Sequence, residues 1–235
     1  MPPPGFLPGC FPGQRDSRDI YEVDVGAPGR AGVAGGFRLT YPAACDAGNW
    51  ARRRYRRGVT AYLHAHAVDG QCRTSEAWVD EDPFGALRFT LFLTVAERPA
   101  SLAALLRAQA PMAARTPDGR AEWSLGEAGG PGRRLGLRPL EFLSPGEGRA
   151  PAPDIYDRWI ARNPAGEPEE VLACRKLGDV ASPVCEHHSL FDGARMTVTF
   201  NRSQLERLRE IEAHARWLLR CAMAGMRRSP PVPGR

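Results

Sequence analysis

Hydrophobic and polar residues alternate on both sides of the dipeptide Asp192-Gly193, near the carboxyl end of the chain. Asp-Gly is a favoured two-residue hairpin turn, so this alternation predicts antiparallel strands over 184–191 and 194–201. The turn also sets the register, because opposed residues share a face of the sheet. His187 is therefore predicted to be a core histidine opposite Val198. The other face carries a mixed polar set that is predicted to face water or form a rim: Glu186, His188 and Leu190 beside Arg195, Thr197 and Thr199.

An amphipathic helix is predicted to follow the hairpin. Ser203 and Glu206 have the spacing of a capping box, in which each side chain satisfies a backbone donor of the first helical turn. Apolar residues then recur at helical spacing and predict one buried stripe on the inner face of the hairpin. The stripe consists of Leu205, Leu208, Ile211, Ala215, Leu218 and Ala222.

The rest of the chain reads mainly as short strands. Period-two alternation or apolar runs predict strands at 20–25, 37–41, 59–68, 87–95 and 135–142 and a short helix at 101–110. Residues 126–132 are predicted to form a Gly-rich loop, and 155–160 fit a strand or a helix. The helices are too few to cover a parallel sheet, so the predicted fold class is α+β. It has a mainly antiparallel sheet with the C-terminal amphipathic helix packed on it.

At 235 residues and 43% hydrophobic composition, the chain is long enough to bury a proper core. We expect one α+β domain over 19–225, with a candidate internal linker at 145–153. A disordered leader is expected at 1–18 and a disordered tail at 226–235, because both segments are rich in Pro or Gly. No run reaches the roughly 18 apolar residues of a membrane helix. Leu7-Pro-Gly-Cys10 partly resembles a lipoprotein signal, so membrane attachment is expected only through an N-terminal anchor that is missing here.

The charge pattern has one sharp feature. The net charge is +5, and Lys176 is the sole lysine among 32 basic residues, a skew that reflects a GC-rich coding genome more than selection for nucleic acid. Five arginines surround Tyr55 and form the proposed partner-binding patch: Arg52, Arg53, Arg54, Arg56 and Arg57. Such a patch serves a solvated edge, an acidic protein partner or, less favourably, nucleic acid.

Histidines offer little evidence for a metal. His64 and His66 share a strand face and have Cys72 nearby, but two histidines on a polar strand face are more often hydrogen-bonded or solvated. His187 and His188 are adjacent and so point to opposite faces of their strand. No serine lies in a nucleophile-elbow sequence. We therefore predict no metal, no cofactor, no small-molecule substrate and no enzymatic activity.

The six cysteines are too sparse for a small disulfide scaffold. Cys174 ends one apolar run and Cys185 opens the hairpin, so a disulfide between them would join two neighbouring strands. Closing this loop would contribute roughly 2 to 3 kcal/mol. Two reduced thiols in the core are the alternative.

Several segments together resemble a group of uncharacterised proteobacterial envelope proteins. The resemblance covers about 134–222 and is carried by Arg134-Leu-Gly-Leu137, Ile155-Tyr156, Leu172-Ala-Cys174, Pro183-Val-Cys185-Glu-His187, Met196-Thr-Val-Thr-Phe200 and the helix from Leu205 to Glu212. Members resemble immunity or accessory proteins encoded beside type VI secretion effectors. The resemblance implies an exported protein of the periplasm or cell envelope whose cysteines can pair, and a cognate protein toxin as partner. Three functions remain open: a non-enzymatic immunity protein, an accessory or structural envelope protein, and, less favoured, a nucleic-acid binder that uses the arginine patch. The alternative location is the cytoplasm.

Overall fold

The structure is a computed structural model that describes most of the chain beyond residue 101 and parts of the chain before it. The described residues are 10–11, 20–25, 37–42, 45, 61–68, 71–73, 88–95, 102–116, 120–127, 130–145, 150–178, 182–192 and 194–224. The chain divides into two compact units. The first unit comprises Met1–Pro99 and Ile211–Arg235, and the second comprises Ala100–Glu210.

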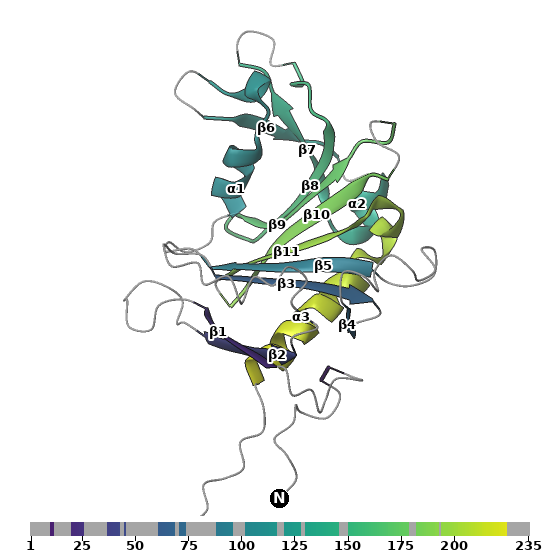
Figure 1. Ribbon diagram of the computed structural model, residues 1–235. Coiled ribbons are helices and arrows are strands. Elements are labelled where there is room, and N and C mark those ends of the chain that lie inside the picture. Colours follow the sequence, from purple (N-terminus) through teal and green to yellow (C-terminus); the bar gives the residue numbers. More distant parts are fainter. Residues whose placement is uncertain are drawn as a thin grey trace, which may run out of the picture. The chain divides into compact units, whose positions relative to one another are not determined.

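The second unit is built on an antiparallel sheet with the strand order β11-β10-β9-β8-β7-β6 (Figure 1). Neighbours in this order are also neighbours in sequence, so each strand pairs with the one before it. The strands are β6 (Glu122–Leu125), β7 (Arg138–Leu143), β8 (Tyr156–Arg162), β9 (Pro168–Arg175), β10 (Val184–Phe191) and β11 (Ala194–Asn201).

The predicted hairpin is confirmed in its register. His187 pairs with Val198 and is fully buried, as expected of a core histidine. Asp192 has φ of 47°, the positive value that a type I′ turn requires at its first central position. The open choice at 155–160 resolves as a strand, because β8 pairs with β7 and β9 along this segment.

Both faces of the sheet in the second unit are covered near its centre. Ile160 and Val171 lie on the face of the sheet that packs against α1 (Leu102–Gln109), where they form a cluster with Leu106 of that helix. Trp159, the next residue along β8, points to the opposite face and is 7% exposed. That face carries the short helix α2 (Gly130–Leu135), because Gly132 lies directly against the indole of Trp159.

The first unit contains two groups of strands and most of the C-terminal helix. It comprises β1 (Ile20–Val25) paired with β2 (Phe37–Pro42), and β3 (Ala61–Val68) paired with both β4 (Gln71–Arg73) and β5 (Arg88–Val95). The helix α3 (Leu208–Ala224) belongs to this unit from Ile211 onward. A disulfide joins its Cys221 to Cys10. The described helices include none with the length and hydropathy needed to cross a membrane.

The expected fold class is confirmed as α+β, with an antiparallel sheet and a C-terminal helix. Every residue of the predicted apolar stripe is at most 6% exposed. The helical segment starts with the 3-10 turn η3 (Arg202–Arg207), which packs against β10 and β11. The single domain over 19–225 remains a prediction.

Two local predictions were wrong. The helix cap is not the Ser203 box, because Asn201 accepts the Ser203 N–H at 2.9 Å and Glu206 pairs with Arg134 instead of turning back. Residues 126–132 are not wholly a loop, since α2 begins at Gly130. In the first case a neighbouring residue, Asn201, takes the cap while the distant Arg134 holds Glu206, and in the second case α2 packs against the distant Trp159.

Candidate functional site

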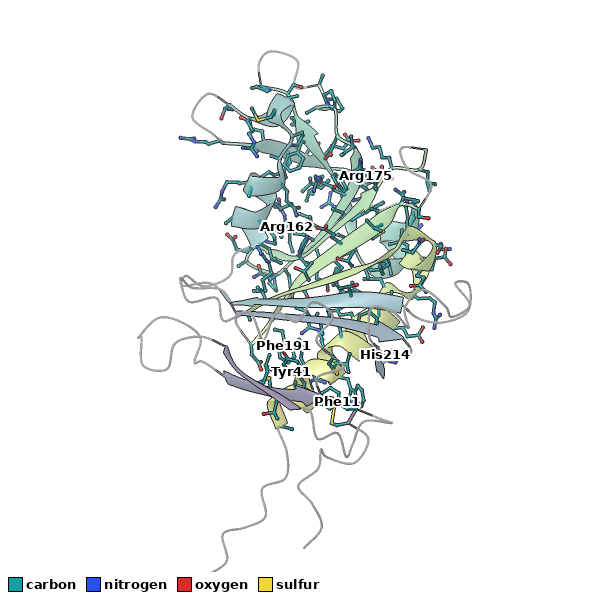
Figure 2. All side chains as sticks on the ribbon, viewed as in Figure 1. Phe11, Tyr41, Arg162, Arg175, Phe191 and His214 are labelled. Atoms are coloured by element: carbon teal, nitrogen blue, oxygen red, sulfur yellow. A yellow bond between two sulfur atoms is a disulfide. The ribbon has the colours of Figure 1, made fainter. Side chains whose placement is uncertain are left out.

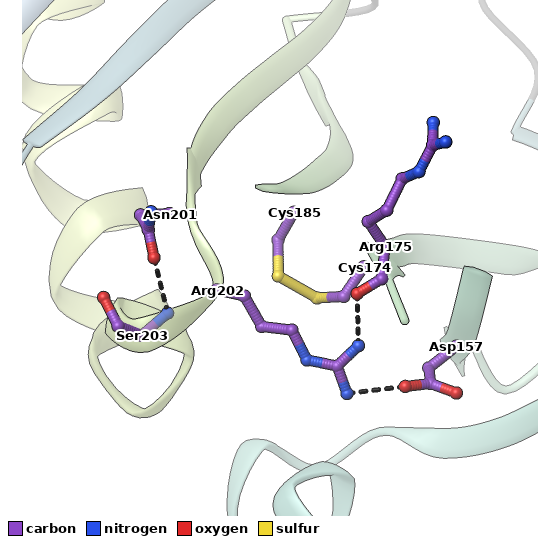
Figure 3. The surroundings of a disulfide bond; sticks show 7 residues. All are labelled: Asp157, Cys174, Arg175, Cys185, Asn201, Arg202 and Ser203. Carbon is purple, nitrogen blue, oxygen red and sulfur yellow. Dashed lines mark hydrogen bonds and ion pairs between the residues drawn. A yellow bond between two sulfur atoms is a disulfide. The ribbon is translucent and has the colours of Figure 1, made fainter. Parts of the chain in front are cut away.

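A disulfide joins the two core cysteines of the second unit (Figure 3). Cys174 and Cys185 lie directly opposite each other on β9 and β10, and their sulfur atoms are 2.00 Å apart. Neither residue is exposed. The structure therefore brings together the pair that was expected from the sequence, on the apolar face of the sheet.

Arg202 ties three elements together beside this disulfide. Its guanidinium donates to the backbone carbonyl of Arg175 at the end of β9 and to the Asp157 carboxylate of β8, at 2.5 Å (Figure 3). The backbone N–H of Arg202 donates to the Pro183 carbonyl at 2.9 Å. This residue thus fixes the start of the C-terminal helical segment to one end of the sheet.

A cavity of about 290 Å³ lies where β7 separates from β8. The pairing of these strands ends at Leu140 and Arg158, and beyond that point β7 pairs instead with the segment around Pro151. Ala152 donates its N–H to the Phe142 carbonyl at 2.7 Å. Part of the candidate linker at 145–153 is therefore held along β7, and its residues form one wall of the cavity.

A buried arginine lies at the floor of this cavity. The Arg158 side chain is 4% exposed, and its Nε donates to the Asp154 carboxylate at 2.7 Å. Its terminal nitrogens donate to the side-chain and backbone oxygens of Gln109, at 3.1 and 3.3 Å. A buried charge is stable only when it is paired and hydrogen-bonded, and Arg158 meets both conditions. It joins α1, β8 and the segment before β8.

This network continues to His188, which the sequence placed on a face suited to water or a rim. That expectation is wrong, because His188 is 4% exposed and lies beneath the end of α1. Its Nδ1 is 2.9 Å from the Thr197 hydroxyl, and its Nε2 is 3.3 Å from the Gln109 amide nitrogen and 3.5 Å from the Glu186 carboxylate. Residues of a helix 79 positions away cover a face that would otherwise be solvated.

The electrostatics of this pair follow from its burial. Burial lowers the pKa of His188, because the charged form loses water, and Arg195 and His187 act in the same direction. The hydrogen bond with His188 lowers the pKa of Glu186 below its ordinary value. The native state therefore favours a neutral imidazole next to an ionised carboxylate.

A second buried histidine is paired on the opposite face. His187 Nε2 lies 3.2 Å from the Glu170 carboxylate, which also accepts from Arg209 at 2.6 Å. Burial raises the pKa of Glu170, but His187 and Arg209 together bring it below the ordinary value. The hydrogen bonds and charge interactions with His187 and Arg209 thus outweigh the burial penalty of the Glu170 carboxylate.

Several candidate site residues named in the sequence analysis cannot be placed, because they lie outside the residues that the structure describes. The five arginines 52–57 fall outside the described residues, as do the side chains of His64, His66 and Cys72. Arg158, Asp154 and Gln109 were not expected, although an arginine flanked by apolar and aromatic residues is a sequence signal of a buried charge.

Comparison with known proteins shows a likeness in fold. No protein-family model matches this chain, and no curated protein matches its sequence. Among solved structures, the fold is similar to that of an immunity protein of the Stenotrophomonas maltophilia type IV secretion system, with a TM-score of 0.51. The two proteins are 15% identical, and the match covers 86% of this chain and 93% of that chain. At this identity the likeness shows a shared fold.

Proposed function

We propose that this protein is a non-enzymatic immunity protein that binds and occludes a cognate secreted toxin. The observation that carries the proposal is the shared fold with a secretion-system immunity protein over most of both chains. The sequence resemblance to immunity and accessory proteins supports it independently. The immediate partner is a protein toxin. The immunity protein inhibits this toxin by covering its active surface, and not by an enzymatic reaction on it.

The secretion system is a finer part of the proposal. The sequence resemblance favours a type VI effector, whereas the solved structural neighbour serves a type IV system. We propose the type VI assignment, and the genes next to this one test it. An adjacent type VI effector gene supports the assignment, and an adjacent type IV effector gene replaces it without affecting the inhibitory role.

We also propose a location in the periplasm or cell envelope. Two buried disulfides, Cys10–Cys221 and Cys174–Cys185, support it, because disulfides persist mainly in oxidising compartments. Cell fractionation of the natural host tests the proposal. Recovery of the protein with the cytoplasm would contradict it and favour the cytoplasmic alternative.

Co-expression with the adjacent toxin gene tests the function. Cells that produce both proteins should survive, and the purified proteins should bind with micromolar affinity or better, on the order of −8 kcal/mol. Inhibition should stop at an equimolar ratio, because occlusion is stoichiometric. Complete inhibition by much less than one molecule of this protein per toxin molecule would indicate an enzymatic reaction on the toxin. Absence of binding would favour an accessory or structural envelope role.

The arginine patch at 52–57 enters the same experiment. If these side chains steer the protein toward an acidic toxin, reversing Arg53, Arg54 and Arg57 to Glu should slow association and flatten its salt dependence. An unchanged association rate would remove the patch from the proposal and leave the immunity role intact.

A further inference from the structure

Three strands of the second unit end side by side in an exposed, cationic and apolar surface. Tyr156 at the start of β8 pairs with Arg175 at the end of β9. Cys174 pairs with Cys185, so Val184 lies beside Arg175 at the next position along β10. Opposed residues share a face. Tyr156, Arg175 and Val184 therefore form one row across three strands.

Large apolar side chains at this sheet end are open to solvent. Leu177 is 74% exposed, Ile155 is 49% exposed and Val184 is 42% exposed. Ile155 and Leu177 flank the same strand pair, because the Lys176 N–H donates to the Ile155 carbonyl at 3.0 Å. Single exposed apolar residues are ordinary, but these three lie at one end of the same sheet and give a partner apolar surface to cover.

The positive charge of this surface is not neutralised within the described residues. Two neighbouring arginines, Arg158 and Arg202, are paired with Asp154 and Asp157. In contrast, neither Arg175 nor Lys176 forms an ion pair with any residue that the structure describes.

Arg175 is held in place but keeps free donors. Its guanidinium carbon lies 5.7 Å from the centre of the Tyr156 ring, and its buried Nε has no hydrogen-bond partner among the described residues. Figure 3 shows its side chain pointing away from the disulfide and Arg202. Glu186, on the same face of the sheet, is directed to His188 at 3.5 Å. The terminal nitrogens of this guanidinium, unlike the buried Nε, can be reached from outside, and they also have no hydrogen-bond partner among the described residues, so they suit a planar carboxylate of a partner.

The surface adjoins the cavity described above. Tyr156 and Lys176 belong to both, and Phe142 and Ala152 supply apolar walls. The volume of about 290 Å³ accommodates a single large side chain. A ligand at this sheet end therefore meets two cationic groups, an aromatic ring, three exposed apolar side chains and a recess.

We propose that this surface, formed by Ile155, Tyr156, Arg175, Lys176, Leu177 and Val184 and here called the sheet-end patch, is where the toxin docks. The occupant is an acidic protein segment whose carboxylate binds Arg175 and Lys176 while a neighbouring apolar side chain packs on Ile155 and Leu177. The charge complementarity selects this occupant over an uncharged one. The inference rests on the proposed function and specifies its interface.

The unique lysine provides a direct test. Lys176 is the sole lysine of the chain, so an amine acetylating reagent modifies only this side chain and the α-amino group. The purified product of the adjacent toxin gene is the probe. In the complex, acetylation of Lys176 should slow at least about tenfold while the α-amino group serves as internal reference. A zero-length carbodiimide cross-link should join Lys176 to an Asp or Glu of the toxin.

Charge reversal provides the second test. The double variant Arg175→Glu/Lys176→Glu should bind the toxin at least about tenfold more weakly. Arg162→Glu is the matched control, because Arg162 is an exposed arginine at the opposite end of the β8–β9 pair and should leave affinity unchanged (Figure 2). Lys176→Glu alone, at an exposed position, keeps the test valid if the double variant melts at a lower temperature.

The outcomes separate the two proposals. If the unaltered protein binds the toxin but Lys176 is not protected and the double variant binds like Arg162→Glu, the sheet-end patch is refuted and the immunity role stands. If the unaltered protein does not bind the toxin, the proposed function fails and the assignment of this surface to a toxin fails with it. Protection of Lys176 with loss of affinity only in the patch variants supports both.

Discussion

Replacing Gly132 with Ala tests how tightly α2 is packed onto the sheet. A Cβ atom at this position would lie 2.5 Å from Cδ1 and 2.9 Å from Nε1 of Trp159. It would also lie 2.9 Å from the backbone oxygen of Leu137. Real carbon contacts are longer by about an ångström. The substitution therefore forces the indole or the backbone to move.

The sign and size of the effect follow from two opposing contributions. Alanine favours a helix over glycine by about 1 kcal/mol. Overpacking a well-packed site costs typically about 1 to 3 kcal/mol. The upper part of this range applies, because the indole is rigid and 7% exposed and the Leu137 N–H is tied to the Gly132 carbonyl at 2.8 Å. We expect a net loss of about 2 kcal/mol, equivalent to a melting temperature lower by about 4 to 8 °C for a chain of this length.

Urea denaturation followed by circular dichroism measures the loss, and a double-mutant cycle identifies its cause. Trp159→Leu removes the indole, so Gly132→Ala should cost at least about 1 kcal/mol less in that background. Gly136→Ala is the control. Gly136 has φ of +73° and open space around it, so its cost comes from backbone strain and should not depend on residue 159.

Two results would refute this account. If Gly132→Ala stabilises the protein, helix propensity outweighs the contact and Trp159 does not press against α2. If the cost is equal with Trp and with Leu at position 159, the clash involves the backbone alone and the indole has no part in it.

Two further predictions concern the buried polar groups and the cysteines. Burial lowers the pKa of His188, so below pH 6.5 the imidazole takes up a proton in the unfolded chain but not in the native state. The free energy of unfolding should therefore fall as the pH drops below 6.5, by at most about 1.4 kcal/mol per pH unit. Urea titrations between pH 8 and 5 should show this slope, and His188→Gln should remove it. Glu186 does not contribute in this range, because its lowered pKa affects stability only below about pH 4.5. An equal slope in the variant would show that His188 is not its source. Thiol labelling of periplasm-expressed protein under denaturing, non-reducing conditions should find Cys174 and Cys185 blocked, and two labelled thiols would show that the bond in the structure does not form in the cell.

The sequence alone specifies the features that depend on close neighbours along the chain, namely the hairpin register and the buried face of the terminal helix. The Asp192-Gly193 turn leaves one favoured register, so the pairing of His187 with Val198 follows from the alternation alone. The buried helical stripe is similarly local, because 3.6-residue periodicity places its members on one side whatever covers them.

The tertiary structure decided what depends on distant contacts. The pairing of Glu206 with Arg134, the start of α2 against Trp159 and the burial of His188 under α1 all depend on residues far apart in sequence. The Arg158 network has the same origin, since Gln109 is 49 positions away from Arg158.

The sheet-end patch also depends on the tertiary structure and not on local sequence. The sequence shows Lys176 and Tyr156 as ordinary polar residues, and nothing in their spacing places them together. Strand pairing brings Tyr156 beside Arg175, and the divergence of β7 from β8 opens the cavity next to them. Periodicity specifies which side of an element is apolar, but only the packing of whole elements decides which polar groups are buried in pairs and which remain open to a partner.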